Sequence, residues 1–377
     1  MRILQKEGLN LTKIALISLL PVLLIYLPFI FHVNSFWGIP FKQTGMQVIF
    51  ANWDGPNYVY NSITNYSPAQ IEVKPFLNVA AYYPAHFPAF SLIIKLFAFV
   101  LPIFWSAIFV QLLSGVVLNF LFFYFIRNVS KHALWLTFAF TIFPPRFWIV
   151  RAVIGPEMLL VGITLAALVL WDKKSYFLGA SLAIIATLFK FQAISIPVAF
   201  LAMWIYETFK TKKLNLIPLI NIIFAFTGYL IVSYYYLLQT GNFNAYFEAQ
   251  KLVGMSAALP FSMFNYAQKW VGTGWMESAA LYFIAIFAMI AKLLNEKKYL
   301  FAIYGIVYAG MLSIIPQVDI MRLSIPLAPL FFYAFHDHLS TKYFRWALIA
   351  SIPLMYLFAI NFILNNQAPI IDWSIFR

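Results

Sequence analysis

The segment IFWSAIFVQLLSGVVLNFLFFYFI, residues 103–126, decides the class of fold. It carries no charged side chain, and about 20 apolar residues are enough for a helix to cross the hydrocarbon core of a bilayer. Similar apolar runs recur along the whole chain of 377 residues, which is 63% hydrophobic and only 10% charged, whereas a soluble domain is about 25% charged. The sequence therefore predicts an all-α, multi-pass membrane protein built as one integral-membrane domain over residues 1–377.

Short clusters of Lys and Arg separate the apolar runs and set the predicted orientation. We place about eleven spanning helices, at roughly 12–31, 103–126, 133–149, 156–171, 175–189, 191–208, 215–238, 278–293, 299–316, 320–335 and 346–364. With a cytoplasmic N-terminus, every basic cluster between them falls on the cytoplasmic side, as the positive-inside rule requires. The net charge of +13 is thus an orientation signal, and no nucleic-acid partner is expected. The basic N-terminus is interpreted as a retained signal anchor.

This orientation depends on residues 86–102, HFPAFSLIIKLFAFVLP. The stretch is apolar, but Pro88, Lys95 and Pro102 favour a helix that lies along the membrane interface without crossing. If residues 86–101 crossed, every later basic cluster would lie outside. The interfacial interpretation leaves a first external loop at 32–101 with interfacial helices, a second at 239–277, and an external C-terminus at Arg377.

The turn ANWDGPNYVY, residues 51–60, places an acid at the predicted outer face of the membrane. One interpretation of Asp54 is turn chemistry, because Asp followed by Gly and Pro starts loops well and its side chain bonds to nearby backbone. The other is a general base on a loop held against a membrane-embedded cavity. Trp53 would then sit at the headgroup level, and burial would raise the pKa of Asp54 towards the working pH.

Further charged residues fall on the same predicted face. A charge deep in a bilayer costs about 2.5–3.5 kcal/mol on insertion scales, so such residues are candidates for function. Each has a structural alternative. Glu157 complements a helix dipole, Lys190 extends its head group to the interface, and Asp319 pairs with Arg322 three residues further on.

Three more residues also have a structural alternative to a functional role. Arg146 and Arg151 bracket a predicted external turn, where they could be a solvated pair, and His86 could serve as an interfacial hydrogen-bonding group. The chain contains no cysteine, which excludes disulfides and thiolate metal sites.

A second motif, AAYYPAHFPAF at residues 80–90, returns the chain to the membrane through two prolines. A WDG-type element followed by such a re-entry, with Tyr82, Tyr83, Pro84 and Pro88, resembles the GPI-anchor second-mannosyltransferase family and its bacterial relatives. These belong to the GT-C superfamily of polyprenyl-phosphate-sugar-dependent glycosyltransferases. Three later segments resemble further motifs of this family in the same order: IGPEMLLVGITLAALVLW (154–171), LGASLAIIATLFKFQAIS (178–195) and DIMRLSIPLAPLFF (319–332). Two positions depart from the pattern, with Lys190-Phe191 where the family usually has Arg-Pro and Leu323 where it has Tyr.

The resemblance implies a GT-C-like bundle that transfers a sugar, mannose by resemblance, from a polyprenyl-phosphate donor to a hydroxyl of a glycan, lipid or protein acceptor. Transfer would proceed with inversion at the outer face of a prokaryotic plasma membrane. Asp54 and Glu157 are the expected catalytic residues, and Lys190 and Arg322 the expected phosphate ligands, because fixed cations stabilise a leaving phosphate. The other expected substrate-binding residues are Arg146, Arg151, His86, Tyr83, Trp53 and Asp319.

No metal and no cofactor is expected beyond the lipid-linked sugar, because the leaving group is a lipid monophosphate and no DxD element is evident. Two alternatives remain from the residues themselves. A lipid-linked glycan polymerase or ligase would be expected to rely on Arg and His in a late large loop, but residues 239–277 contain neither, and Lys251 and Lys269 are their only basic residues. A multi-pass transporter or flippase often shows internal repeats and helices broken near the membrane midplane, and neither feature is evident in the sequence.

Overall fold

The computed structural model describes residues 2–42, 44–252, 254, 259–266, 272–315, 317, 319–370 and 372–376. Arg377, predicted to be external, lies outside these residues. Nearly all regular structure in the described part is helical, apart from the antiparallel pair β1 (Ser35–Phe36) and β2 (Ile39–Pro40). The prediction of an all-α, multi-pass membrane protein is therefore confirmed at this level.

Six helices within the described residues contain a stretch long and apolar enough to cross a membrane. They are α1 (Arg2–Ile30), α6 (Ile103–Ile126), α11 (Ser195–Thr211) with the preceding η2 (Phe191–Ile194), α12 (Leu216–Thr240), α15 (Gly272–Asn295) and α20 (Lys342–Asn365). A seventh results if α7 (Ala133–Ile142) and α8 (Pro145–Ala152) form one span with a 77° bend. Pro144 and Pro145 lie at this bend and cannot donate the backbone hydrogen bonds that a continuous helix needs.

The remaining predicted spans are present as helices, but they are short or broken. These are α9 (Glu157–Asp172), α10 (Tyr176–Thr187), α16 (Tyr299–Ile314), and the succession α17 (Ile320–Leu323), η3 (Ile325–Leu327) and α18 (Ala328–Ala334). A helix of 16 residues, such as α9, is about 24 Å long, less than the roughly 30 Å hydrocarbon core. Length and composition thus identify six or seven spans in the described part, and not eleven.

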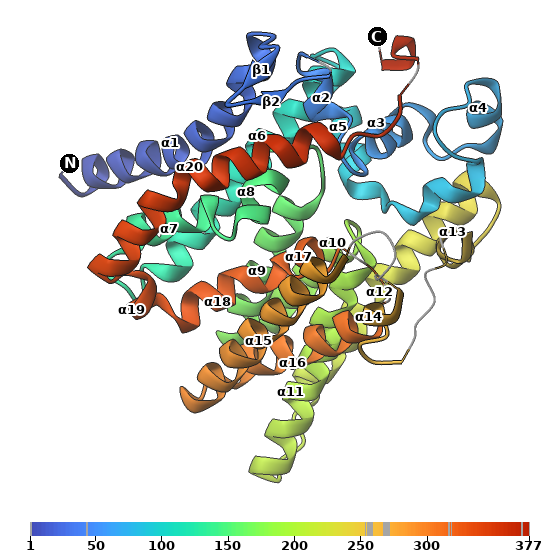
Figure 1. Cartoon of the computed structure of the whole chain (residues 1–377). Helices are drawn as coiled ribbons and strands as arrows, with labels where there is room; N and C mark the ends of the chain where they lie inside the picture. Colours follow the sequence, from blue (N-terminus) through green and yellow to red (C-terminus); the bar gives the residue numbers. More distant parts are fainter. Residues whose placement is uncertain are drawn as a thin grey trace.

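Short helices cluster at one end of the bundle, where the sequence predicted external loops (Figure 1). The first loop forms α2 (Gln47–Phe50), α3 (Gly55–Thr64), α4 (Pro68–Val73), η1 (Ala80–Ala85) and α5 (Pro88–Phe97). The second contributes α13 (Ala245–Leu252) and α14 (Met263–Tyr266); α19 (His336–Leu339) and η4 (Ser374–Phe376) complete the described elements. With ten residues, α5 extends about 15 Å and is too short to cross as a helix, so its placement along the interface stays a prediction.

The long helices form two groups with the site between them. In Figure 1, α1, α6 and α20 run together above, while α11 and α15 lie below, together with the shorter α16. The short helix α9 packs against both α6 and α10 in the interior. Its N-terminus therefore meets the first loop and α17, and these three segments carry the candidate site.

Candidate active site

The turn that carries Asp54 is shaped by close backbone packing. Trp53 has a positive φ of 46°, and a Cβ on Gly55 would lie 3.0 Å from the Phe50 carbonyl and 3.2 Å from that of Ile154. Glycine is therefore needed for the turn to lie against the segment that leads into α9. Asp54 is the N-cap residue of α3, but its side chain makes no capping hydrogen bond. The carboxylate is left to face the bundle, so turn chemistry alone does not account for it.

The C-terminal segment clamps the same turn. Asn52 Nδ2 donates to the carbonyls of Val48, at 2.8 Å, and Ile363 in α20, at 3.0 Å. Ala368 N donates to the Ala51 carbonyl at 2.7 Å. Backbone from both ends of the chain thus fixes where Asp54 lies.

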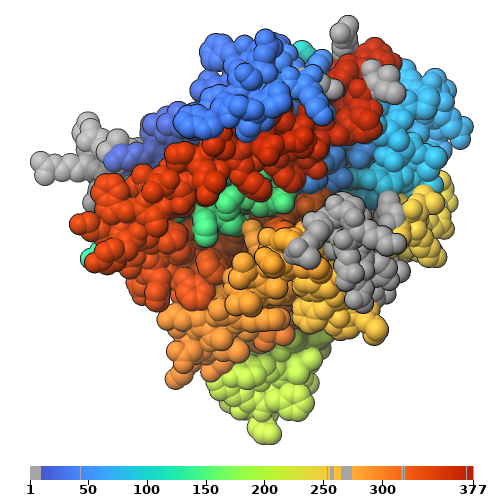
Figure 2. Space-filling view, in the orientation of Figure 1, coloured from blue at the N-terminus to red at the C-terminus, as the bar shows by residue number. Residues whose placement is uncertain are grey.

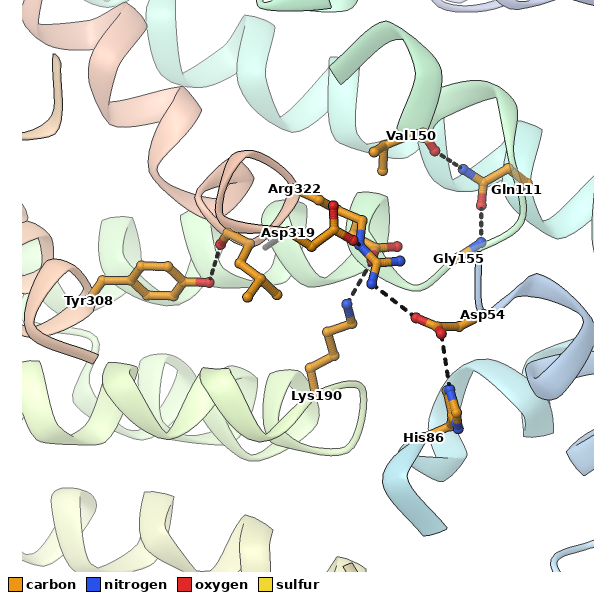
Figure 3. Close-up of polar contacts among 11 residues, drawn as sticks. Asp54, His86, Gln111, Val150, Gly155, Lys190, Tyr308, Asp319 and Arg322 are labelled. Carbon is orange, nitrogen blue, oxygen red and sulfur yellow. Dashed lines mark hydrogen bonds and ion pairs between the residues drawn. The ribbon is translucent and has the colours of Figure 1, made fainter. Parts of the chain in front are cut away.

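Arg322 is the centre of the site and contacts three carboxylates (Figure 3). Its Nη2 lies 3.1 Å from Asp54 Oδ2, its Nε 2.8 Å from Asp319 Oδ2, and its Nη1 3.8 Å from Glu157 Oε1. The side chain is 11% exposed, and its guanidinium carbon lies 5.0 Å from the centre of the Trp53 ring. The predicted pairing of Asp319 with Arg322 is present, and it belongs to a larger ionic cluster.

Lys190 completes this cluster from the other side of Glu157. Its Nζ lies 2.7 Å from the same Oε1 that Arg322 approaches. The two cationic head groups are therefore at most about 6.5 Å apart, the sum of their distances to that oxygen. Glu157 is 6% exposed, and it opens α9 as predicted. Its position between two cations accounts for its burial as an ionised group.

Neutral hydrogen bonds hold the segments that carry these charges. Gln111 of α6 donates to the Val150 carbonyl at 2.9 Å and accepts from Gly155 N at 3.1 Å, which ties α6 to the connection between α8 and α9 (Figure 3). Tyr308 donates to the Leu323 carbonyl at 2.8 Å and so holds in place α17, the helix that carries Arg322. The charged side chains thus project from backbone that is itself anchored.

His86 lies on the opposite side of Asp54 from Arg322. Its Nε2 is 3.4 Å from Asp54 Oδ1, and the rings of Tyr58 and Tyr82 pack against it at 5.1 and 5.3 Å. Its backbone carbonyl accepts hydrogen bonds from the hydroxyls of Tyr66 and Tyr236. His86 therefore contacts the carboxylate directly and is more than an interfacial hydrogen-bonding group.

A cavity of about 520 Å³ opens onto this cluster. Four of the predicted site residues line it: Asp54, His86, Lys190 and Arg322. Aromatic and amide side chains form much of the remaining wall, including Tyr58, Tyr82, Tyr246, Gln192 and Gln250, together with Lys251. The volume and the mixture of apolar walls with a few convergent polar groups are typical of small-molecule sites.

The charges around Asp54 decide its protonation. Burial alone would raise the pKa of its carboxyl, but the Arg322 guanidinium, the hydrogen bond from His86 and the positive charge of Lys190 together hold the pKa below its ordinary value. The direction is opposite to the sequence prediction, which considered burial and could not include partners far along the chain. Asp54 is therefore an ionised carboxylate, able to accept a proton but weakly basic while Arg322 remains paired with it.

Three predicted site residues lie away from the cavity. Arg151 is 1% exposed, so the prediction of a solvated Arg146–Arg151 pair at an external turn is wrong. Both residues lie in the short helix α8. Arg146 packs on the rings of Phe362 and Trp53. Tyr83 is turned from the cavity towards Tyr60, at 4.8 Å between ring centroids.

The sequence missed residues that do line the cavity. Tyr82 lines the cavity where its neighbour Tyr83 was expected. The sequence AAYYPA could not show which of the two tyrosines faces the cavity, because η1 is a 3-10 helix in which side chains do not alternate as they do in a strand. Lys251 is a cation of the second loop. Because that loop lacks Arg and His, the sequence argued against placing a site there. The sequence carried no sign that α13 packs against η1 and places this lysine at the cavity.

Comparison with protein-family models, with curated proteins and with solved structures found no match to this chain. Within the described ranges, no three His, Cys, Asp or Glu side chains are grouped as a metal site would require. The fold and site define a multi-pass membrane protein with a buried ionic cluster beside a cavity. The resemblance to GT-C enzymes stays a prediction.

Proposed function

We propose that this protein is a GT-C-type membrane glycosyltransferase that moves a sugar, mannose by resemblance, from a polyprenyl-phosphate donor to an acceptor hydroxyl. The observation that carries the proposal is the meeting of Asp54 with Lys190 and Arg322 at one cavity, from segments far apart in the chain. Glycosyl transfer needs a proton acceptor and fixed cations on the two sides of one sugar carbon. The cavity offers both kinds of group.

The proposed reaction is a single displacement at the anomeric carbon. Asp54 takes the proton of the acceptor hydroxyl as its oxygen forms the new bond to that carbon. The bond from the carbon to the phosphate oxygen breaks, and the lipid phosphate leaves with the electron pair. The configuration inverts because attack and departure occur on opposite faces.

The leaving phosphate must compete for cations that are already paired. Arg322 faces three carboxylates and Lys190 faces Glu157, so neither contributes a free positive charge to the empty cavity. Lys251 also lines the cavity, and among the described residues no carboxylate lies within ion-pair distance of it. In our proposal Lys251 meets the phosphate first, while Arg322 and Lys190 stabilise the charge that develops as the bond breaks.

The proposed topology has about eleven crossings, with the shorter helices among them, a cytoplasmic N-terminus and the cavity facing outward at a prokaryotic plasma membrane. It is supported by the distribution of Lys and Arg between apolar runs. Cysteines introduced in place of Lys173 and Lys297, each in a variant of this cysteine-free chain, should be protected from impermeant maleimide in intact cells. Labelling of both before lysis would reverse the orientation.

The function is tested with purified protein in sealed lipid vesicles. Polyprenyl-phosphate mannose, glucose and arabinose are supplied in turn with a mixture of glycan and lipid acceptors, and products are identified by mass spectrometry. One donor should yield a glycosylated acceptor and free lipid phosphate in equal amounts. Movement of the intact donor across the membrane without any transfer product would instead identify a flippase.

A further inference from the structure

A second cavity, of about 220 Å³, lies between α15, the α17–α18 segment and the bend that joins α7 to α8. Its described lining is apolar for the most part, with Phe143, Pro144, Leu281 and Ala285 among the residues, and shares no residue with the cavity at Asp54. Figure 2 shows this region as a recess between α20, in red, and the orange α15 and α18, with green atoms of the α7–α8 segment at its floor. Because α15 is one of the candidate spans and Leu281 is exposed on it, the cavity opens at the depth of lipid chains.

Arg146 lies beside this cavity and is not one of its lining residues. It follows Phe143 and Pro144, which line the wall, and Tyr282 on the facing wall of α15 lies within electrostatic range of it. Its guanidinium carbon lies 4.1 Å from the centre of the Phe362 ring, so an aromatic face covers one side of the group.

No carboxylate among the described residues lies within ion-pair distance of Arg146. Its Nη1 is buried, and none of the described residues accepts a hydrogen bond from it. Asp319 is the carboxylate whose field it feels most, yet that side chain is engaged by Arg322 Nε at 2.8 Å. A buried guanidinium N–H without an acceptor is unfavourable, and arginine pairs well with phosphate oxygens.

These two features together identify an occupant. An apolar cavity beside a membrane span excludes water, which would find no hydrogen-bonding partners there, and hydrocarbon chains of the bilayer surround it. We propose that a bilayer phospholipid with an anionic headgroup binds here, with its phosphate on Arg146 and one acyl chain in the cavity. A net negative headgroup is required because a choline would bring back the positive charge that the phosphate neutralises.

The inference does not rest on the proposed function. Arg146 does not line the cavity at Asp54, and no ion pair joins it to Asp54 or Glu157. The site can therefore be tested by binding alone, whether or not the protein transfers sugar.

The first test measures headgroup preference. Purified protein is equilibrated with equal amounts of phosphatidylglycerol and phosphatidylcholine, and the lipids retained are counted by native mass spectrometry. The wild type should prefer phosphatidylglycerol, and Arg146→Gln should lower this preference about tenfold, the effect of one charge-assisted hydrogen bond. Arg127→Gln is the matched control, because Arg127 is an exposed cation stacked on Tyr124 at 4.1 Å with no place in the cavity. An unchanged preference in Arg146→Gln would overturn the proposal.

The second test fills the cavity and leaves Arg146 in place. Ala285→Leu projects into the cavity, whereas Ala288→Leu lies on the exposed face of the same helix. Retention of phosphatidylglycerol should fall in the first variant and persist in the second. If polyprenyl phosphate instead binds in preference to phosphatidylglycerol and loses that preference in Arg146→Gln, the site belongs to the sugar donor and the proposal is overturned.

Discussion

Arg322 and Arg151 are both buried cations in an apolar bundle, yet their surroundings differ in kind. Arg322 lies among three carboxylates and lines a cavity. Arg151 donates to Asn119 Oδ1 at 2.8 Å and to the Gly115 carbonyl at 3.5 Å, and it lies over the Phe147 ring at 4.5 Å. It lines neither the Asp54 cavity nor the one below Arg146.

The contrast separates two uses of a buried charge. Around Arg322, the hydrogen-bonding and ion-pair partners are carboxylates, so removal of the arginine or of one acid leaves an ion uncompensated in a low dielectric. Around Arg151, the partners are an amide, a carbonyl and aromatic faces, which can be replaced by apolar groups of the same shape. Burial of an arginine therefore does not indicate a functional site by itself; charged neighbours beside a cavity do.

The largest effect is expected at the carboxylate that Arg322 shares with the cavity. Asp54→Asn keeps the size of the side chain and an oxygen for Arg322, but it cannot accept a proton. Sugar transfer should fall by about 10²–10⁴-fold, the usual contribution of a general base, while protein yield persists. Asp337→Asn, at an exposed carboxylate on α19, is the control and should leave turnover unchanged. Near-normal turnover in Asp54→Asn would remove Asp54 from the catalytic role.

Removing the central cation should have the next largest effect, this time on stability. Arg322→Met leaves Asp54 and Glu157 with Lys190 and His86 nearby, and Asp319 with the field of Arg146. Loss of one partner of a buried ionic group typically costs about 3–5 kcal/mol, and the free energy of unfolding in a denaturing-detergent titration should fall by that amount. Combining Arg322→Met with Asp319→Asn should recover part of the loss. If the single variant is as stable as the wild type, the cluster contributes nothing to stability.

The pH dependence of stability tests the same ion pair. Because Arg322, His86 and Lys190 depress the pKa of Asp54 in the folded state, Asp54 contributes stability that is fully present above its unfolded-state value of about 3.8. This contribution is lost only as pH falls from there through the folded-state pKa. The difference in unfolding free energy between wild type and Asp54→Asn should therefore be constant from pH 7 to about pH 4 and shrink below it. A difference that already shrinks between pH 7 and pH 5 would show that the pKa is raised.

The smallest effect is expected at the other arginine. The double variant Arg151→Met, Asn119→Leu removes both partners of a buried hydrogen bond, which is nearly neutral when shape is kept. Its unfolding free energy should change by less than about 1 kcal/mol, and sugar transfer should persist. Arg151→Met alone should cost more than the double variant, because it leaves Asn119 Oδ1 without its donor. A large loss of transfer in the double variant would restore Arg151 to the functional site.

The sequence predicted where the helices lie better than how many cross. Apolar runs near 156–171 and 299–316 do form helices, each of 16 residues and close to the predicted bounds, but helices of this length are shorter than the roughly 30 Å hydrocarbon core. In the run 320–335, Pro326 and Pro329 fall at the breaks between α17, η3 and α18. Composition therefore identifies an apolar segment, while helix ends decide whether it spans.

For the site, charge at the predicted outer face, together with the family resemblance, selected Asp54, Glu157, Lys190 and Arg322, which the structure brings together. Two features of the site could not be predicted from the sequence. The direction in which a side chain points could not be read, so Arg151 was placed with the exposed charges. The contact of α13 with η1 joins distant segments, so Lys251 was passed over.

The clamp that the C-terminal segment places on the Asp54 turn has a consequence for biosynthesis. The ribosome makes Asn52 early, but its partner Ile363 follows 311 residues later, and Ala368 later still. During most of translation and membrane insertion the turn therefore lacks these hydrogen bonds, because neither Arg322 nor α20 has yet been made. A chain released before residue 363 would carry the acid and most of the bundle without the clamp. Residues 363–368 close the site only after they have been made, so a truncation before residue 363 would perturb the position of Asp54.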